Sequence, residues 1–233
     1  MREAGVISSQ LLMRYEQRMT TSVSASLRAL ARDIDARWAS DPIPIIAELL
    51  LKWQTTLSDL IFKFNETIAR EGVVHIIRAR DRKNEGVDLV MMGIRFRLRN
   101  YSRARAELIE RYLRDRVARE LREGVSIADA RTTIRNILRN PNYAARIART
   151  ESHIALERGA FEAARSLGVR ITKEWISRED AHVRPDHAAA HGQIREIEAP
   201  FDVGGEHLLY PGDPSASARN TVNCRCTVNY RLE

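Results

Sequence analysis

The stretch VRITKEWIS, residues 169–177, lies where the pattern of the sequence changes. Before it, up to about Gly168, apolar residues recur at steps of three and four, the spacing that collects side chains on one face of a helix. From this stretch onward the chain has short β-like segments and loops with glycine and proline. The change predicts a fold of the α+β class, with a mainly α-helical N-terminal part and a small, loop-rich α+β C-terminal module.

Two long apolar stripes near the start of the chain predict a pair of long helices. One stripe covers residues 12–38 and the other covers residues 46–68. Between them, Ser40, Asp41 and Pro42 should end the first helix. Asp41 can cap the second helix, with Pro42 at its first position. A short turn between two long helices favours antiparallel packing.

Residues 72–100 fit two different structures. Gly72, Gly86 and the charged residues 78–85 suggest interruptions of the helical pattern. Apolar residues alternate with arginine over residues 94–98, which is typical of a strand. Because no turn signal follows at once, the same residues could also open a helix, and the sequence leaves both interpretations open.

Helical patterns return after this segment. Residues 102–122 carry an apolar stripe, and Ser126 with Asp129 makes an approximate capping box at the start of the next helix. We therefore expect two domains. The first is a helical domain of long antiparallel helices, residues 1–124, and the second covers residues 125–233.

The basic charge of the chain is concentrated in one part of the helical domain, residues 95–122. The net charge is +7, and all but four of the 38 basic residues are arginine. The segment holds ten arginines against four acidic residues. It could bind the phosphates of duplex DNA without sequence preference, or form a solvated helix face whose charges pair along the helix. The candidate DNA-binding residues are Arg103, Arg111, Arg114, Arg119 and Arg122.

The C-terminal module concentrates residue types that bind metal ions. Four of the six histidines lie between residues 182 and 207, and the two cysteines of the chain follow them. Two imidazoles and two thiolates would make a tetrahedral structural zinc site. The alternative is that the cysteines are small packed residues or a redox-sensitive pair. The candidate ligands are His187, Cys224, Cys226 and His191, with His182 or Asp180 as other choices for the fourth position.

The same cluster allows a catalytic interpretation. Asp180, His182, Asp186 and His187 could supply a general base and its partner in a metal-dependent hydrolase or nuclease. The sequence contains no nucleophile elbow, phosphate-binding loop or paired carboxylates to accompany them. Capping of turns by the two aspartates, or pairing with nearby arginines, is the simpler explanation. We therefore expect a protein that is not an enzyme.

The composition also bears on the compartment. No run of about 18 apolar residues is present, so the sequence predicts no membrane span and no membrane partner. The N-terminus lacks the apolar core and the small-residue cleavage site of a signal peptide. A single pair of cysteines does not make the disulfide framework of a secreted protein. These features predict a cytoplasmic place of synthesis and assembly.

Three C-terminal stretches resemble a known family. They read ARIARTESHIALERGAFEAARSLGV (145–169), KEWISREDAHVRPDHAAAHGQ (173–193) and LLYPGDPSASARNTVNCRC (208–226). Separate motif blocks occur in the order found in the phage Mu F-like family, whose members are also called phage head morphogenesis or minor capsid proteins. The resemblance covers roughly residues 125–230. The blocks are Arg149–Glu151, Trp175, Asp180–His187, Gly192, Tyr210–Asp213 and Asn223–Cys226.

The resemblance implies a structural role in a tailed bacteriophage. It implies a minor head protein of low copy number that acts in procapsid assembly at the portal and in DNA packaging or ejection. The implied partners are the portal protein, the scaffold and the major capsid protein, together with packaged duplex DNA. The implied location is the virion, in the head interior or portal region, after assembly in the bacterial host cytoplasm. The resemblance also favours His187, Cys224 and Cys226 over His191 as metal ligands.

Overall fold

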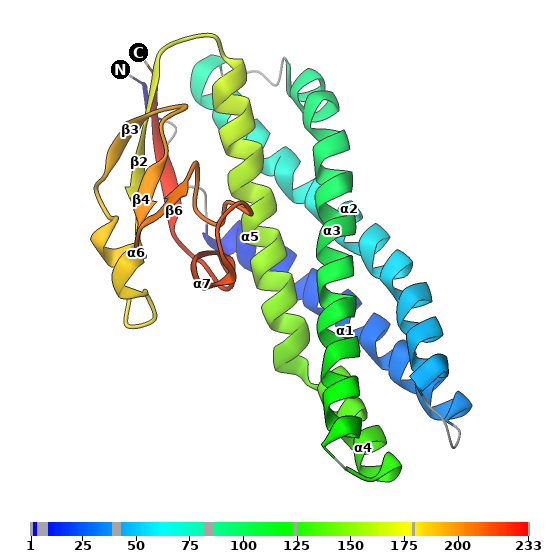
Figure 1. Ribbon diagram of the computed structural model, residues 1–233. Coiled ribbons are helices and arrows are strands. Elements are labelled where there is room, and N and C mark those ends of the chain that lie inside the picture. Colours follow the sequence, from blue (N-terminus) through cyan, green and yellow to red (C-terminus); the bar gives the residue numbers. More distant parts are fainter. Residues whose placement is uncertain are drawn as a thin grey trace. The chain divides into compact units, whose positions relative to one another are not determined.

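The computed structural model describes residues 2–3, 9–38, 43–81, 86–123, 125–178 and 180–232 (Figure 1). The helices are α1 (Ser9–Arg37), α2 (Ile43–Asp81), α3 (Val87–Arg122), α4 (Ile127–Arg139), α5 (Pro141–Ser166), α6 (Pro185–Ala189) and α7 (Ala218–Thr221). The strands are β1 (Arg2–Glu3), β2 (Ile171–Ile176), β3 (Ile194–Glu196), β4 (Phe201–Val203), β5 (Glu206–Leu208) and β6 (Thr227–Leu232). Long helices followed by short antiparallel strands confirm the predicted α+β class. The expected cap at Asp41 and Pro42 lies outside the described residues.

Packing divides the chain into two compact units that are interleaved along the sequence. Unit 1 comprises Met1–Tyr15, Asn65–Phe96 and Arg149–Glu233, and unit 2 comprises Glu16–Phe64 and Arg97–Ala148. The helices α1, α2, α3 and α5 each contribute residues to both units. The domain division expected from the sequence instead cuts the chain once, after residue 124, into two consecutive stretches. It stays a prediction about which parts of the protein can be separated.

Unit 2 is built on the two apolar stripes expected from the sequence. Trp53 Nε1 in α2 donates a hydrogen bond to Ser26 Oγ in α1 at 2.8 Å, and Arg37 pairs with Glu48 at 2.7 Å. The second pair lies nearer the loop between the helices than the first, as antiparallel packing requires. The buried core residues from these two helices are Met19, Val23, Leu27, Leu30, Ala31, Ile34, Ile46, Leu49, Leu50, Trp53, Leu57 and Ile61.

Helix α4 is held in unit 2 by a capped start and by an aspartate of α1. Ser126 Oγ accepts a hydrogen bond from the backbone nitrogen of Asp129 at 3.1 Å, which confirms the expected cap. Arg131 and Arg135 donate to the Asp35 carboxylate at 3.0 and 2.8 Å. The hydrogen bond from Arg135, aided by Arg131 and partly opposed by burial, lowers the pKa of Asp35.

The described residues of the segment 72–100 are helical except at Gly86, a turn residue with φ of 89° that lies between α2 and α3, as its predicted interruption requires. Helix α2 continues through Gly72, and α3 covers residues 94–98. Ile94 and Leu98 are buried, whereas Phe96 is 73% exposed. A strand would place all three side chains on one face, but a helix separates the middle one from the other two. The helical interpretation is therefore confirmed and the strand interpretation is excluded.

Two glycines allow α2 and α5 to approach each other closely within unit 1. A Cβ atom on Gly159 of α5 would lie 2.1 Å from the carbonyl oxygen of Ala69. A Cβ atom on Gly72 of α2 would lie 2.3 Å from the carbonyl oxygen of Leu156. Both separations are far below van der Waals contact, so only glycine fits at these positions. Gly72 therefore makes room for the neighbouring helix and does not interrupt α2.

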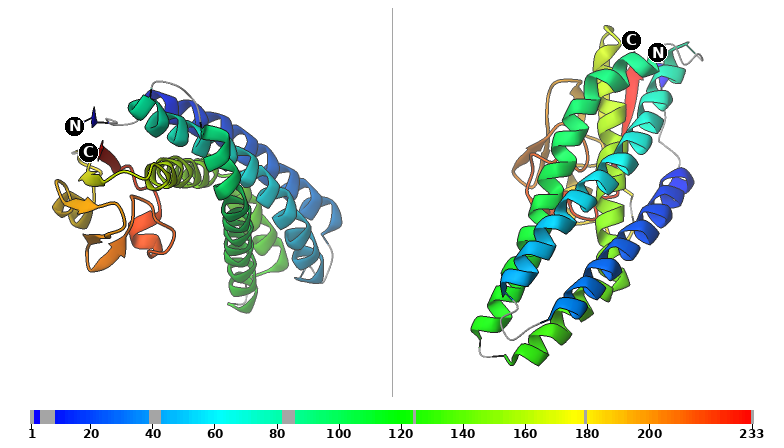
Figure 2. Two further views of the ribbon diagram at one scale, coloured as in Figure 1. Left: turned by 90° about the horizontal axis from the view of Figure 1, so that it is seen from above. Right: turned by 90° about the vertical axis from the view of Figure 1, so that its right-hand side faces the viewer.

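Unit 1 contains a four-stranded sheet in the order β1-β6-β2-β3, in which the N-terminal β1 pairs with the C-terminal β6, and a separate β4–β5 hairpin. Strands β2 and β6 pair antiparallel, with Lys173 opposite Tyr230. Alternate residues of β2, namely Ile171, Lys173 and Trp175, are buried. Both views of Figure 2 show the yellow-green C-terminal half of α5 beside the red β6. The Lys173 ammonium lies 5.0 Å from the ring centre of Phe161 in α5, so the buried face of this sheet packs on the helix.

Long helices also raise the question of a membrane span. Within the described ranges, no helix combines the length and the apolar composition that crossing a bilayer requires.

Candidate metal centre

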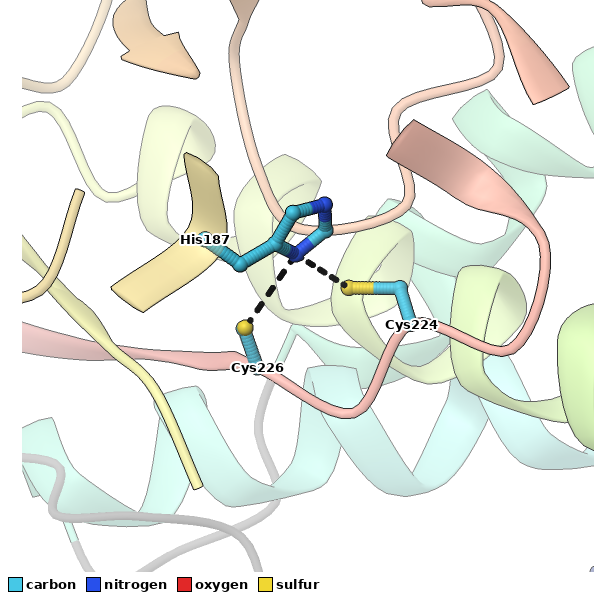
Figure 3. Close-up of side chains that lie close together, drawn as sticks. All are labelled: His187, Cys224 and Cys226. Carbon is cyan, nitrogen blue, oxygen red and sulfur yellow. Dashed lines mark hydrogen bonds between the residues drawn. The ribbon is translucent and has the colours of Figure 1, made fainter. Parts of the chain in front are cut away.

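Three of the four ligand candidates come together in unit 1 (Figure 3). His187 lies in α6, and Cys224 and Cys226 lie just before β6. The three residues are 2%, 1% and 2% exposed. Nδ1 of His187 lies 3.4 Å from Sγ of Cys226 and 3.7 Å from Sγ of Cys224. The three ligand atoms all lie within 4.8 Å of one another, so this group could hold a metal ion.

A chain of hydrogen bonds sets the orientation of the His187 ring. Its Nε2 lies 3.2 Å from Oδ1 of Asn220, and Nδ2 of Asn220 donates to the carbonyl oxygen of Val203 at 3.1 Å. Because the amide nitrogen is used by Val203, the amide presents its oxygen to the ring, and the proton of neutral His187 belongs on Nε2. Nδ1 then directs a lone pair toward the two sulfurs. Partners that fix the tautomer in this way accompany most histidine ligands of metals.

The two sulfurs interact strongly with each other. The hydrogen bond from the Cys224 thiol lowers the pKa of Cys226 to about 5, against the effect of burial and with a further contribution from His187. The same hydrogen bond, together with burial, raises the pKa of Cys224 well above its usual value. A cation between the sulfurs would favour the thiolate at both, since metals bind the deprotonated form.

The cysteine segment, residues 223–227, is attached to α5 at both of its ends. The backbone nitrogen of Asn223 donates to Thr150 Oγ1 at 3.1 Å, and Asn223 adopts a left-handed backbone with φ of 55°. At the other end, Thr227 Oγ1 donates to Glu157 Oε1 at 2.7 Å. Asparagine tolerates the left-handed conformation better than most residues, which suits it to the tight turn that leads into the two cysteines.

The other sequence candidates for the metal have different partners. His191 Nδ1 accepts a hydrogen bond from the backbone nitrogen of Ser177 at 3.0 Å. Asp180 pairs with Arg225 at 2.7 Å and accepts from the backbone nitrogen of His182 at 2.9 Å. Among the residues that the structure describes, none of these three candidates joins the three-residue group. Asp180 instead supports the cysteine segment from outside, through the arginine between the cysteines.

The local structure explains why His191 lies apart from His187. A spacing of four places two residues on one face only while the helix continues. Helix α6 ends at Ala189, and the chain turns at residues 190–192. The direction of the His191 side chain is therefore set by the turn, which brings it to Ser177.

Asp186, one of the residues in the catalytic interpretation, also makes structural contacts. Its carboxylate pairs with Arg219 of α7, and a Cβ on Gly204 would lie 2.7 Å from that same carboxylate. Arg184, just before α6, donates to the carbonyl oxygen of Val222. These contacts tie α6 to the segment that leads to Cys224.

Helix α5 contributes two buried ionisable residues that the sequence patterns do not single out. His153 and Glu157 lie one helical turn apart and are each 2% exposed. Burial, with a further contribution from His187, lowers the pKa of His153 to about 4. Burial also raises the pKa of Glu157 to about 8, although Thr227 donates to it. Within the described residues, His153 Nε2 and Glu157 Oε2 have no hydrogen-bond partner.

Lys173 is a further buried ionisable residue that the sequence patterns did not identify. It is fully buried, and its ammonium donates to the carbonyl oxygen of Leu209 at 2.7 Å between the rings of Phe161 and Phe201. Burial lowers its pKa to about 7. The alternation of β2 is the signal that could have found it, since Lys173 shares a strand face with Trp175.

The arginine face consists of Arg103, Arg111, Arg114, Arg119 and Arg122, all exposed on α3 in unit 2. At about 3.6 residues per turn, these five positions fall within about half of the helix circumference. They lie opposite the buried Ala106, Ile109 and Leu113. Arg114 pairs with Glu110 of the same helix at 3.4 Å. The structure thus gathers the candidate arginines on one exposed face, and their binding to DNA stays a prediction.

Comparison with known families identifies the class of protein. The chain belongs to the family described as Phage Mu protein F like protein, whose model matches residues 111–229. The match covers just over half of the chain and confirms the resemblance of the C-terminal motifs. Membership in this family places the chain among phage head morphogenesis proteins.

One curated relative is an enzyme of much greater length. A segment of 88 residues is 33% identical to part of the NAD(+)–arginine ADP-ribosyltransferase EFV of Enterococcus faecalis. The match covers 36% of this chain and 18% of that protein, so the chain spans less than a fifth of the relative's length. No solved structure matches the chain.

Proposed function

We propose that this protein is a minor head protein of a tailed bacteriophage that acts in procapsid assembly at the portal and in DNA packaging or ejection. The observation that supports this role is the match of residues 111–229 to the Mu F-like family. The proposed partners are the portal protein, the scaffold and the major capsid protein. The proposed location is the virion, in the head interior or portal region, after assembly in the bacterial host cytoplasm.

Burial of the motif residues supports a structural role for the matched region. Trp175, Tyr210 and Cys224, each from a different motif block, are 0%, 4% and 1% exposed. Side chains buried to this degree pack the interior and do not contact a substrate. A catalytic metal in a hydrolase or nuclease would also keep an open coordination position, whereas the candidate ligands are enclosed. These features support a role without catalysis over the enzymatic alternative.

Purified phage particles test the head assignment. We expect immunoblots to detect the protein in procapsids from infected or induced cells, at few copies relative to the major capsid protein. A phage with an early stop codon in this gene should yield fewer DNA-filled heads, and a plasmid copy of the wild-type gene should restore the yield. Absence of the protein from both procapsids and virions would contradict the assignment.

We propose that the arginine face contacts duplex DNA without sequence preference. Binding through phosphates should weaken steeply with added salt, because each contact releases counterions from the DNA. Replacing Arg111, Arg114 and Arg119 together with glutamate should abolish binding. Fluorescence anisotropy with two duplexes of unrelated sequence, at low and physiological salt, measures both properties.

A matched control reverses the same number of charges on α1 of unit 2. Arg18, Arg28 and Arg32 are exposed there and lie outside the arginine face. Their replacement with glutamate should leave most of the binding intact. Equal loss in both triple variants would show that net charge decides the affinity, and unchanged binding in the first variant would rule out the arginine face.

We propose that the ion held by His187, Cys224 and Cys226 is a structural zinc ion. With Zn–S of about 2.3 Å and Zn–N of about 2.0–2.1 Å, a tetrahedral centre separates a nitrogen ligand from a sulfur ligand by about 3.6 Å. The observed separations of 3.4 and 3.7 Å lie on either side of that value. Imidazole and thiolate ligands also suit zinc, whereas magnesium and calcium prefer oxygen. A disulfide is the weaker alternative, because a bridge between such close cysteines is strained and the cytoplasm is reducing.

A further inference from the structure

Helix α5 directs one face at the cysteine segment. Thr150, His153 and Glu157 follow one another at spacings of three and four and therefore share a side of the helix. Thr150 binds the backbone of Asn223, and Glu157 binds Thr227. These two contacts lie on either side of the two cysteines. His153 lies between these contacts along the helix and on the same side of it.

His153 brings a nitrogen atom without a partner into this enclosed region. Within the described part of the chain, its Nε2 is buried and makes no hydrogen bond. A buried polar atom without a hydrogen-bond partner destabilises the fold unless an ion or another group binds it. Gly212 covers one side of the ring, since a Cβ there would lie 3.2 Å from Cδ2 of His153.

We infer that His153 supplies the fourth ligand of the zinc ion, which then joins α5 to α6 and to the cysteine segment. This inference rests on the proposed zinc site. His153 lies outside the group whose ligand atoms are all within 4.8 Å of one another, so its ring must shift toward the sulfurs when the ion binds. Because Nε2 has no hydrogen bond within the described residues, none of its bonds has to break for that shift.

Charge favours His153 over Glu157 as the fourth ligand. One Zn²⁺ ion and two thiolates are neutral together, and a neutral histidine keeps the buried centre neutral. A carboxylate would leave one net negative charge in a region without solvent.

X-ray absorption at the zinc edge tests the inference on the full-length wild-type protein. We expect two sulfur and two nitrogen ligands, with outer-shell scattering from two imidazole rings. One imidazole together with an oxygen ligand would overturn the role of His153 and leave the zinc site in place. Absence of zinc from protein purified under reducing conditions would instead overturn the zinc proposal itself.

Three single variants separate the candidate ligands by zinc affinity, measured in competition with a chromogenic chelator. His153→Ala should lower the affinity more than tenfold, since loss of even an outer-shell partner costs about 10–100-fold. His191→Ala removes a histidine of the same module and should keep the affinity. Glu157→Gln retains an oxygen that can accept the hydrogen bond from Thr227, and this variant should also keep the zinc affinity. Unchanged affinity in His153→Ala, or a larger loss in Glu157→Gln, would contradict the inference.

Discussion

Replacing Cys224 and Cys226 together with serine should unfold the C-terminal module, residues 171–232, and leave the helices of unit 2 folded. Serine does not hold zinc in this setting, and two hydroxyl groups would replace sulfurs in a buried site. Structural zinc contributes about 10–16 kcal/mol of apparent binding free energy in zinc-finger peptides, which exceeds the roughly 3–5 kcal/mol that a small core supplies. The loss of the ion should therefore cost the module its stable fold.

Hydrogen exchange read by mass spectrometry checks this result region by region. Amides of β2 and β6 should lose protection in the double variant, while those of α1 from Glu16 onward keep theirs. A chelator added to reduced wild-type protein should reproduce the loss, and it should have no further effect on the variant. A protein that contains no zinc, with a variant as stable as the parent, would return both cysteines to the role of ordinary packed residues.

Replacing Gly159 with alanine should lower the free energy of unfolding of unit 1 by about 3 kcal/mol or more. The added Cβ would lie 2.1 Å from the carbonyl oxygen of Ala69, and it meets backbone that no side-chain rotation can move away. Helices α2 and α5 must therefore separate where they now touch. The effect should exceed the gain of about 1 kcal/mol that alanine brings over glycine in a helix.

Gly93→Ala is the matched control, because Gly93 is also in a long helix and a Cβ there meets nothing within 4 Å. This variant should keep the stability of the parent or gain up to about 1 kcal/mol. Urea unfolding of both variants, followed by circular dichroism, gives the comparison. Equal stability of Gly159→Ala and the parent would show that the contact between α2 and α5 can relax at little cost.

The helices and their buried faces could be predicted because they depend on local spacing. Residues at steps of three and four in α1, including Met19 and Leu27, are buried as expected. The cap of α4 at Ser126 needs only a neighbour three residues away, and it is present. The α+β class follows from the same kind of information, since the periodicity changes near Gly168.

Residues 72–100 show where local patterns become insufficient. The alternation around Phe96 suits a strand, yet the segment is a helix whose buried residues are Ile94 and Leu98. Burial of a residue depends on the neighbours that pack on it, and those neighbours come from elsewhere in the chain. Gly72 likewise suggests a break when only its own segment is considered. In the structure it makes room for a close contact with α5, which comes from another part of the chain.

For the metal site, too, the sequence determined one part and the tertiary structure another. Residue types identified His187, His191, Cys224 and Cys226 as candidates, since imidazole and thiolate groups are few in this chain and gather near its end. The family resemblance favoured His187 and the two cysteines over His191. Only the tertiary structure decided that these three come together and that His191 turns away to Ser177. The physical reason is that periodicity sets which residues share a face within one element. Contacts between elements depend on how helix and strand surfaces fit together, and the sequence of any single element does not contain that information.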